Sequence, residues 1–507
     1  MRSLSPSSRS EPWQNWDFGI ASILVLATVL AAVVLRRTAG LWGALGSDAA
    51  LWGLTARDLT VGAPPIVPPL YPLIVSGFQA LGLPLVDAGW HVSTLSHGLL
   101  VGLVWYAART LGTPRSLALI AAIATALLPD LATWAQQVQP DSTAAMALLL
   151  WAILLVHAPT SPKHALGAAI VAGLLPALRA HGLVAIPLTV LVFLTSIPRG
   201  WKWCLPMIAW WMALPIMLGV SSTWNPLGLP WSDRTNSALS ALTTHDAAEL
   251  PYLRELTRVP RSEYIDLLEK RDLTGRLLWH IQRSLSGAWS LWLLILATVV
   301  LVWRRHRSAW ILTVPFATAL PALFIWSQRR HVALLVPIAI VAIVATIPHL
   351  SFRGKTLAKG CFLAWTCIML TTWPTRIANQ QSERYKANHF AQAATIIAEA
   401  NATMEPPSKT PLLGGLYQDI GLYQDLPRHD PDGTDADWHT YWVATQPPPD
   451  MEGDRWTEIS EPIGELRIYR LAPDRVDRPC ADGSVQSTTP HVVRRRAHAE
   501  MTGCDSE

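Results

Sequence analysis

Long apolar stretches occupy most of the first three-quarters of the chain, separated by short polar or charged segments. A helix that crosses a bilayer needs roughly 17–25 mostly apolar residues, and most of these stretches approach or reach that length. We interpret about eleven of them as membrane spans, at 18–35, 88–108, 116–133, 142–157, 165–178, 182–197, 203–220, 286–303, 308–326, 332–349 and 357–374. The pattern therefore predicts an all-α, polytopic membrane protein.

Two segments of this region follow a different pattern. Residues 68–84 are apolar but begin with prolines, which fits a re-entrant or surface helix better than a span. Residues 221–285 are charged, and their apolar positions recur at roughly helical spacing within 265–278. Two interpretations of this loop stand, a solvated surface helix or an amphipathic helix lying on the bilayer, and the flanking spans favour the second.

The C-terminal quarter has another composition. Residues 375–507 carry 13 Lys+Arg and 21 Asp+Glu, a net charge of −8, whereas the rest of the chain carries +12. A helical stretch at 383–400 precedes strand candidates at 411–416, 439–444 and 465–471. We expect four parts: a disordered tail at 1–16, a transmembrane domain at 17–374 with outer loops 37–87 and 221–285, a small α/β extracytoplasmic domain at 375–474, and a disordered tail at 475–507.

The distribution of Lys and Arg predicts the orientation. The chain is only 15% charged, against about a quarter in soluble domains, and Lys and Arg favour cytoplasmic loops. With the N-terminus inside, thirteen of these residues fall on the cytoplasmic side and six on or near the other, namely Arg36, Arg37, Arg57, Arg179, Arg329 and Arg330. We therefore expect the C-terminal domain outside, although an error of one span would invert all that follows it.

Acidic residues are rare and gather on one side in this topology. Outside 221–285, the acids between Phe18 and Pro374 are Asp48, Asp58, Asp87, Asp130 and Asp141. A carboxylate near a bilayer is costly and marks a functional site by default. Five on the outer face predict a polar reaction chamber there.

Several stretches resemble the polytopic glycosyltransferases of the GT-C fold, a class that includes protein O-mannosyltransferases and bacterial aminoarabinose transferases. They are GSDAALWGLTARDL after the first span, PPLYPLIVSGFQALG, ALLPDLATWAQQVQPDSTAAMALLLWAILL, GLLPALRAHGLVAIPL and RRHVALLVPIAI. Their order and spacing cover most of residues 18–350. The resemblance implies an inverting hexosyl- or pentosyltransferase that moves a sugar from a polyprenyl-phosphate-linked donor to a lipid, glycan or protein acceptor, with no nucleic acid involved.

The chain departs from the family pattern at one point. The family often has two adjacent acids after the first span, whereas here Asp48 is followed by Ala49. No clear metal-ligand set results, so no metal is assigned and a possible divalent cofactor stays open. His91 and His97 are six residues apart, whereas a helical metal pair usually has a spacing of three or four.

The acids are the candidates for activating the acceptor, because a carboxylate beside the attacking atom can serve as a general base. The resemblance assigns this role to Asp48, which by its sequence can equally be a helix N-cap. Asp58 lies almost three turns further on the same face, to assist or to pair with a cation. Asp141 can contact donor or acceptor, with capping as the alternative, and Asp87 is expected to be a cap.

Basic residues are the candidates for holding the donor phosphate. Arg179 and the group Arg329, Arg330 and His331 lie on the outer face, against the positive-inside bias. Anchoring to lipid headgroups is the alternative for each. Trp134 and Gln137 are candidates for contact with a sugar or the acceptor, or else belong to an ordinary interfacial turn.

The sequence thus favours a glycosyltransferase of the cell envelope in a bacterial inner membrane. The rival from another class is a polytopic transporter or lipid flippase, which places its key charges near the midplane, often in repeated halves. We find no internal repeat. A third interpretation is a non-catalytic GT-C homologue, which the missing second acid keeps open.

Overall fold

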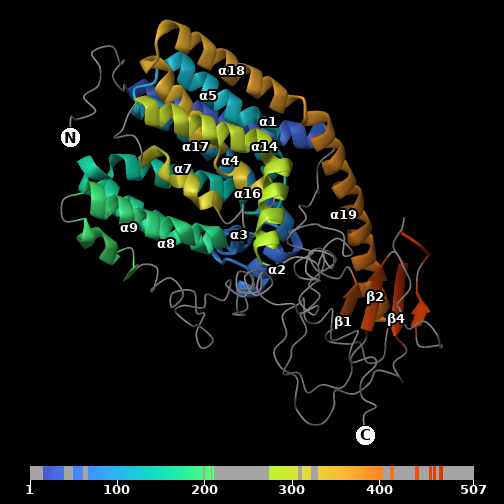
Figure 1. The fold of residues 1–507 in the computed structure, drawn as a ribbon. Helices are drawn as coiled ribbons and strands as arrows, with labels where there is room; N and C mark the ends of the chain where they lie inside the picture. The colour runs from blue at the N-terminus through green and yellow to red at the C-terminus, as the bar shows by residue number, and fades with distance from the viewer. Residues whose placement is uncertain are drawn as a thin grey trace. The chain divides into compact units, whose positions relative to one another are not determined.

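The computed structural model (Figure 1) describes residues 15–38, 49–60, 67–197, 200–206, 208–209, 273–305, 311–320, 329–403, 412–415, 440–444, 456–459, 461–463 and 467–471. The chain divides into two compact units. The first contains Met1–Leu41 and Thr55–Asn379, and the second contains Trp42–Leu54 and Gln380–Glu507.

The first unit is built from helices. Its long elements are α1 (Asn15–Thr38), α4 (Leu85–Thr110), α7 (Asp141–His157), α8 (Pro162–Leu178), α14 (Leu273–Arg305) and α18 (Phe352–Leu370). Shorter ones are α3 (Leu70–Ala80), α5 (Arg115–Leu127), α6 (Pro129–Trp134), α9 (Ala185–Ser196), α16 (Arg329–Ala333) and α17 (Val336–Thr346), with 3₁₀ turns η1 (Ala158–Thr160), η2 (Ala180–Val184), η5 (Val314–Ala319) and η6 (Ile347–His349). Helices α2 (Ala49–Thr60) and α19 (Trp373–Ala402) cross the division between the units.

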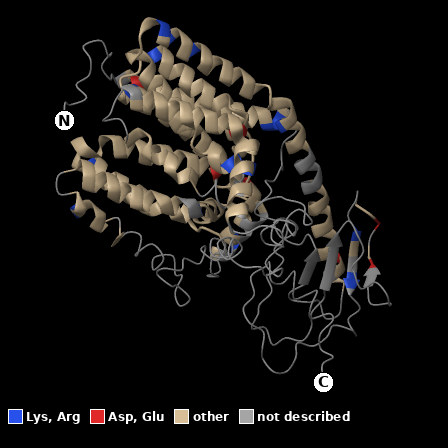
Figure 2. Cartoon of the chain, viewed as in Figure 1, with Lys and Arg blue, Asp and Glu red and all other residues tan. Residues whose placement is uncertain are grey.

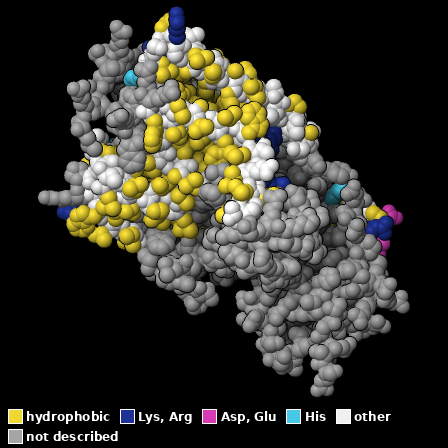
Figure 3. All heavy atoms as spheres, viewed as in Figure 1, with side chains coloured by type: hydrophobic (Ala, Val, Ile, Leu, Met, Phe, Trp, Pro, Cys, Tyr) yellow, Lys and Arg dark blue, Asp and Glu magenta, His cyan; other side chains and the backbone are white. Residues whose placement is uncertain are grey.

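The first unit is that of an integral, multi-pass membrane protein. Within the described residues, four helices are long and apolar enough to cross a bilayer, or five if α3 and α4 count as one bent span. Large apolar side chains face outward, including Ile23 on α1 and Leu296 on α14. Figure 3 shows hydrophobic atoms covering most of this unit on the face in view. The predicted number of about eleven spans stays a prediction.

One predicted span is broken within the described residues, and another is confirmed. The span predicted at 116–133 is wrong as a single helix, since α5 ends at Leu127 and α6 starts at Pro129. Leu128 between them is extended, with φ −62° and ψ 121°, because a residue before proline is sterically disfavoured in the helical region. The span predicted at 332–349 is confirmed as part of Arg329–His349, one of the four candidate spans, which is built from α16, α17 and η6 in succession.

The two segments singled out for their unusual pattern also bend. Helix α3 begins after Pro69 and leaves α4 at an angle of 118°, so it does not extend α4 into one straight span. Residues 273–285 of the predicted outer loop belong to α14 together with the predicted span 286–303. A non-helical residue, Ala288 (φ −135°, ψ 26°), interrupts that helix.

Helices α1 and α4 approach closely because α4 has glycines on the contact face. A Cβ at Gly98 would lie 2.7 Å from Val29 Cγ2 and 3.0 Å from the Val25 carbonyl oxygen, and a Cβ at Gly102 would lie 2.6 Å from Val25 Cγ2. Positions four apart share one face of a helix. Small residues of this kind let two membrane helices pack backbone to backbone.

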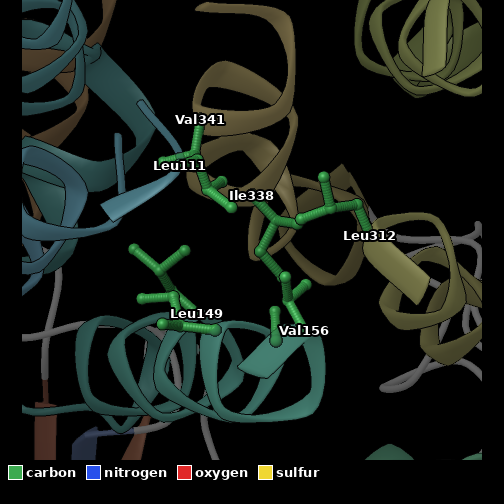
Figure 4. Close-up of a pocket in the computed structure, with 8 residues that line it drawn as sticks. Leu111, Leu149, Val156, Leu312, Ile338 and Val341 are labelled. Carbon is green, nitrogen blue, oxygen red and sulfur yellow. The ribbon is translucent and has the colours of Figure 1, made fainter. Parts of the chain in front are cut away.

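The interior of the bundle is tightly packed. One apolar gap between α7, α17 and their neighbours has a volume of only about 10 Å³ (Figure 4) and is lined by Leu111, Leu149, Ala152, Ile153, Val156, Leu312, Ile338 and Val341. A space of about one water volume without polar partners does not hold a ligand. This gap is therefore not a binding site.

The second unit contains a four-stranded sheet. Its strands are β1 (Leu412–Gly415), β2 (Thr440–Ala444), β3 (Trp456–Glu458) and β4 (Arg467–Leu471), in the order β1-β2-β4-β3. The β1–β2 pair is parallel, with Leu413 opposite Tyr441, and the other two pairs are antiparallel. The C-terminal half of α19 covers this sheet, where Phe390, Ala394 and Ile397 pack against Ile468. The three strand candidates from the sequence coincide with β1, β2 and β4.

Candidate functional site

Charged side chains are sparse along the helices of the first unit and gather near helix ends (Figure 2). At the start of α1, fully buried Asp17 pairs with Arg109 Nε at 3.3 Å and Arg115 Nε at 3.5 Å. Near the other end of α1, buried Arg36 lies over the Trp90 ring, with 4.2 Å from its Cζ to the ring centroid. The two ends of the α1–α4 pair therefore carry separate polar groups.

Among the described residues, three charged side chains form an arginine cluster, which we define as Asp130, Arg329 and Arg376. Arg329 donates through Nε (3.1 Å) and Nη2 (3.0 Å) to Oδ2 of Asp130, and Arg376 Nη2 donates to Oδ1. Asp130 is buried, whereas the arginine side chains are 29% and 33% exposed. Two partly exposed cations on one carboxylate leave the cluster with a net positive charge and donor groups for a further anion.

Three separate segments supply this cluster. Asp130 lies in the first turn of α6, just after the break at Leu128. Arg329 opens the short helix α16, and Arg376 lies in the first turn of α19. The cluster therefore forms only when the start of α19 packs beside α6 and α16. The Trp373 indole holds α19 in this place by donating a hydrogen bond to the Leu127 carbonyl oxygen at 2.9 Å.

A cavity of about 480 Å³ opens beside the arginine cluster. It is lined by Leu24, Ala27, Thr28, Ala31, Ala32, Leu35, His97, Val101, Ile123, Ala126, Leu127, Ala132, Gln136, Trp373 and Ile377. The lining is mostly apolar. Ile123 and Leu127 remain 45% and 47% exposed, so the cavity is an open groove and not a sealed void.

The groove and the cluster meet along two helices. On α19, Trp373 and Ile377 line the groove, and Arg376 lies on the same face because residues three and four apart are neighbours on a helix. On the α5–α6 side, the lining residues Leu127 and Ala132 flank Asp130 in the chain. The charged groups therefore lie at the edge of an apolar groove.

A second buried ion pair joins α7 to the residue that caps α8. Arg179 Nη2 lies 2.5 Å from Asp141 Oδ2, and both side chains are buried. Asp141 begins α7 as predicted, but the capping alternative is wrong, since the N-cap is Pro140 and no side chain caps the helix. A buried carboxylate requires a partner, and Arg179 has taken that role.

The remaining predicted acids are only partly described. Asp48 lies outside the described residues, and so does the side chain of Asp58, although its backbone belongs to α2. Asp87 lies in the first turn of α4, but Pro84 is the N-cap there and no side chain caps the helix, so its expected capping role is wrong. The assignments of Asp48 and Asp58 stay predictions.

The other predicted contacts are placed but not brought into one site. Arg330 and His331 follow Arg329 on α16, and His331 is buried. Trp134 at the end of α6 is buried as well. Gln137 is half-buried, and its Oε1 accepts a hydrogen bond from Gln139 Nε2. Their roles toward phosphate and sugar stay predictions.

Sequence reasoning missed Arg376 and the residues of the groove. Arg376 follows the last predicted span by two residues and was grouped with the C-terminal domain, although a cation at that boundary was the available signal. Buried Gln136 donates through Nε2 to the Ala32 carbonyl oxygen at 3.1 Å and joins the turn after α6 to α1. The pairing of α1 with this turn has no signature in the sequence.

Among the described residues, no group of three or more His, Cys, Asp or Glu side chains is arranged to hold a metal ion. This finding covers neither Asp48 nor the side chain of Asp58.

Comparison with known proteins gives structural matches alone. No protein-family model matches the sequence, and no curated protein matches it. The structure is similar to ArnT from Cupriavidus metallidurans bound to undecaprenyl phosphate, at 15% identity and a TM-score of 0.46, over 92% of this chain and 99% of that one. ArnT from the same organism in the apo state matches at 14% identity and a TM-score of 0.41, over 88% and 98%.

Since both TM-scores are below 0.5, we draw no conclusion about activity from these matches.

Proposed function

We propose that the protein transfers a sugar from a polyprenyl-phosphate-linked donor to a lipid, glycan or protein acceptor on the extracytoplasmic face of the membrane. The observation that carries this proposal is the apolar groove of about 480 Å³ with the arginine cluster at its edge. A prenyl phosphate has the same two parts, a long hydrocarbon chain and one anionic head.

The groove suits the hydrocarbon part of such a lipid. Its walls come from α1, α4, α5 and α19, and several lining side chains remain exposed toward what would be the bilayer. Burying apolar surface stabilises a complex by roughly 25 cal/mol per Å². Inside a membrane that gain is small, because the hydrocarbon chain is already out of water. The groove therefore selects the lipid by the fit of its chain, and the phosphate head group provides the affinity.

The arginine cluster suits the phosphate. Arg329 and Arg376 both offer guanidinium groups to the phosphate, and guanidinium groups bind phosphate oxygens through pairs of parallel hydrogen bonds. During transfer, the bond from the anomeric carbon to the phosphate oxygen breaks, and that oxygen keeps the electron pair. Fixed cations at this position stabilise the developing charge.

The acceptor needs a base, and Asp48 is our proposal for it. The acceptor oxygen or nitrogen forms a bond to the anomeric carbon from the side opposite the phosphate, which inverts the configuration, while its proton passes to the carboxylate. Asp58 and Asp141 would support this centre, Asp141 as a carboxylate held by Arg179 at 2.5 Å. Neither the sugar nor the acceptor is specified by these residues.

The test is transfer by purified protein in lipid nanodiscs, supplied with a panel of radiolabelled polyprenyl-phosphate sugars and a membrane-lipid acceptor extract. We expect one donor to lose its label to the acceptor, and Arg376→Gln to raise the KM for this donor about tenfold or more, the loss of one charge-assisted contact. Arg353→Gln removes an exposed cation outside the cluster and should leave the KM unchanged. Absence of transfer with every donor would contradict the proposal.

A lipid flippase is the second candidate, favoured by the bend of 118° between α3 and α4. Broken helices often form the binding sites of transporters. The same assay separates the two functions, since a flippase moves the labelled lipid between leaflets without forming a new glycosidic bond.

A further inference from the structure

The phosphate site proposed above already contains an anion of its own. The Asp130 carboxylate accepts from Arg329 at 3.1 and 3.0 Å through one oxygen and from Arg376 through the other. The carboxylate is buried, whereas both arginines keep about a third of their surface exposed. A lipid phosphate that binds the exposed sides of these arginines will lie within a few ångströms of Asp130.

A fixed negative charge this close discriminates between lipids by their charge. A polyprenyl-phosphate sugar is a phosphodiester with one negative charge. The polyprenyl phosphate released after transfer is a monoester with a charge of roughly −1.5 to −2 at neutral pH. Repulsion between charges a few ångströms apart is large at the effective dielectric constant of a protein, so the more highly charged lipid suffers more from the carboxylate.

We propose that Asp130 determines specificity by making the arginine cluster favour singly charged phosphodiester lipids over doubly charged phosphomonoester lipids. This inference rests on the proposed function, because it assumes that the cluster binds a prenyl phosphate. Its consequence is that the donor is retained and the spent carrier is released, although both have the same hydrocarbon chain.

The competing role for Asp130 is purely structural, as a pin that orients two arginines. The protein contains a matched example of such a pin at the start of α1. Asp17 also lies between two arginines, Arg109 and Arg115, and is also buried, but it does not line the groove. Removing a charge there tests the loss of a buried ion pair without touching the proposed site.

The experiment measures lipid binding to the purified full-length protein in nanodiscs. The probes are a polyprenyl phosphate and its methyl phosphodiester of equal chain length, so that the unknown sugar plays no part. For Asp130→Asn we expect the affinity ratio of monoester to diester to rise about tenfold or more. For Asp17→Asn we expect an unchanged ratio, and for Arg376→Gln weaker binding of both lipids.

The possible outcomes separate the inference from the function on which it rests. If Asp130→Asn changes the affinity of both lipids by the same factor, Asp130 is only a pin and the inference is wrong. If the unmodified protein binds neither lipid more tightly than the uncharged polyprenol, the proposed function itself fails. Should Asp130→Asn not fold, Asp130→Glu keeps the charge and should keep the wild-type ratio, so a shifted ratio there would also overturn the inference.

Discussion

At the scale of single residues, buried carboxylates form ion pairs with arginines, and these pairs stabilise the fold. Asp17, Asp130 and Asp141 are all buried, and each pairs with at least one arginine. Breaking a buried pair by removing one partner costs about 3–5 kcal/mol, since the other charge is left without compensation. Residues of this kind hold the fold whatever else they do, and any functional test of them needs a stability measurement beside it.

Asp48→Asn is the sharpest test of the proposed base. We expect this variant to lose transfer by at least a factor of about 10²–10⁴, the usual contribution of a general base, while its binding of polyprenyl phosphate and its thermal unfolding stay unchanged. The measurement is the single-turnover transfer rate in nanodiscs. Asp87→Asn provides the matched control, as another acid at the start of a helix. Wild-type rates for Asp48→Asn would assign the base to another residue.

The same scale shows what residues alone could predict. Arg179 and Arg329 stand out in the sequence because the predicted topology places them on the outer face, where a cation opposes the positive-inside bias. Their partners are not predictable in this way, since Arg329 and its partner Asp130 are 199 residues apart in the chain and no local pattern links them. Arg179 was expected to bind phosphate or lipid headgroups, and its buried pairing with Asp141 depends on how α7 and α8 dock.

At the scale of elements, helix packing explains why the groove exists. Glycines of α4 draw α1 close at Gly98 and Gly102, and Gln136 ties the turn after α6 to Ala32 near the end of α1. The break at Leu128 then turns α6 away from α5. The groove lies between these fixed elements and the first turn of α19.

Gly98→Ala tests this packing. A Cβ there would lie 2.7 Å from Val29 Cγ2 and 3.0 Å from a backbone oxygen, and overpacking of this kind costs typically about 1–3 kcal/mol. We expect a lower unfolding temperature and weaker lipid binding. Gly19→Ala is the control, since a Cβ at that helical position meets nothing within 4 Å and alanine is the better helix former. Equal stability of the two variants would refute close packing of α1 on α4.

Element types were largely predictable, and element boundaries were not. Apolar runs mark the long helices because a single segment can satisfy all its own backbone groups in lipid only as a helix. The division of 116–133 at Leu128 could have been predicted from Pro129, but the apolar run outweighed this signal. Strand β3 has only three residues and stands out from its surroundings neither by length nor by alternation.

At the scale of the whole molecule, the mechanism depends on which side of the membrane the N-terminus faces. The excess of Lys and Arg on one side predicts a cytoplasmic N-terminus. We expect alkaline phosphatase to be active when fused after residue 403 and inactive when fused after residue 161, because the enzyme folds only in an oxidising compartment. The reverse pattern would place the arginine cluster inside the cell.

The most direct test of the account is photo-crosslinking of purified protein with a polyprenyl phosphate that carries a diazirine in its hydrocarbon chain, followed by peptide mapping. Groove residues of α1, α5 and α19, such as Ala31, Ile123 and Ile377, should be labelled. An excess of unlabelled polyprenyl phosphate and the Arg376→Gln substitution should each remove that labelling. Labelling that spreads over the outer surface of the bundle, or that persists under both conditions, would contradict a prenyl-phosphate site at this groove.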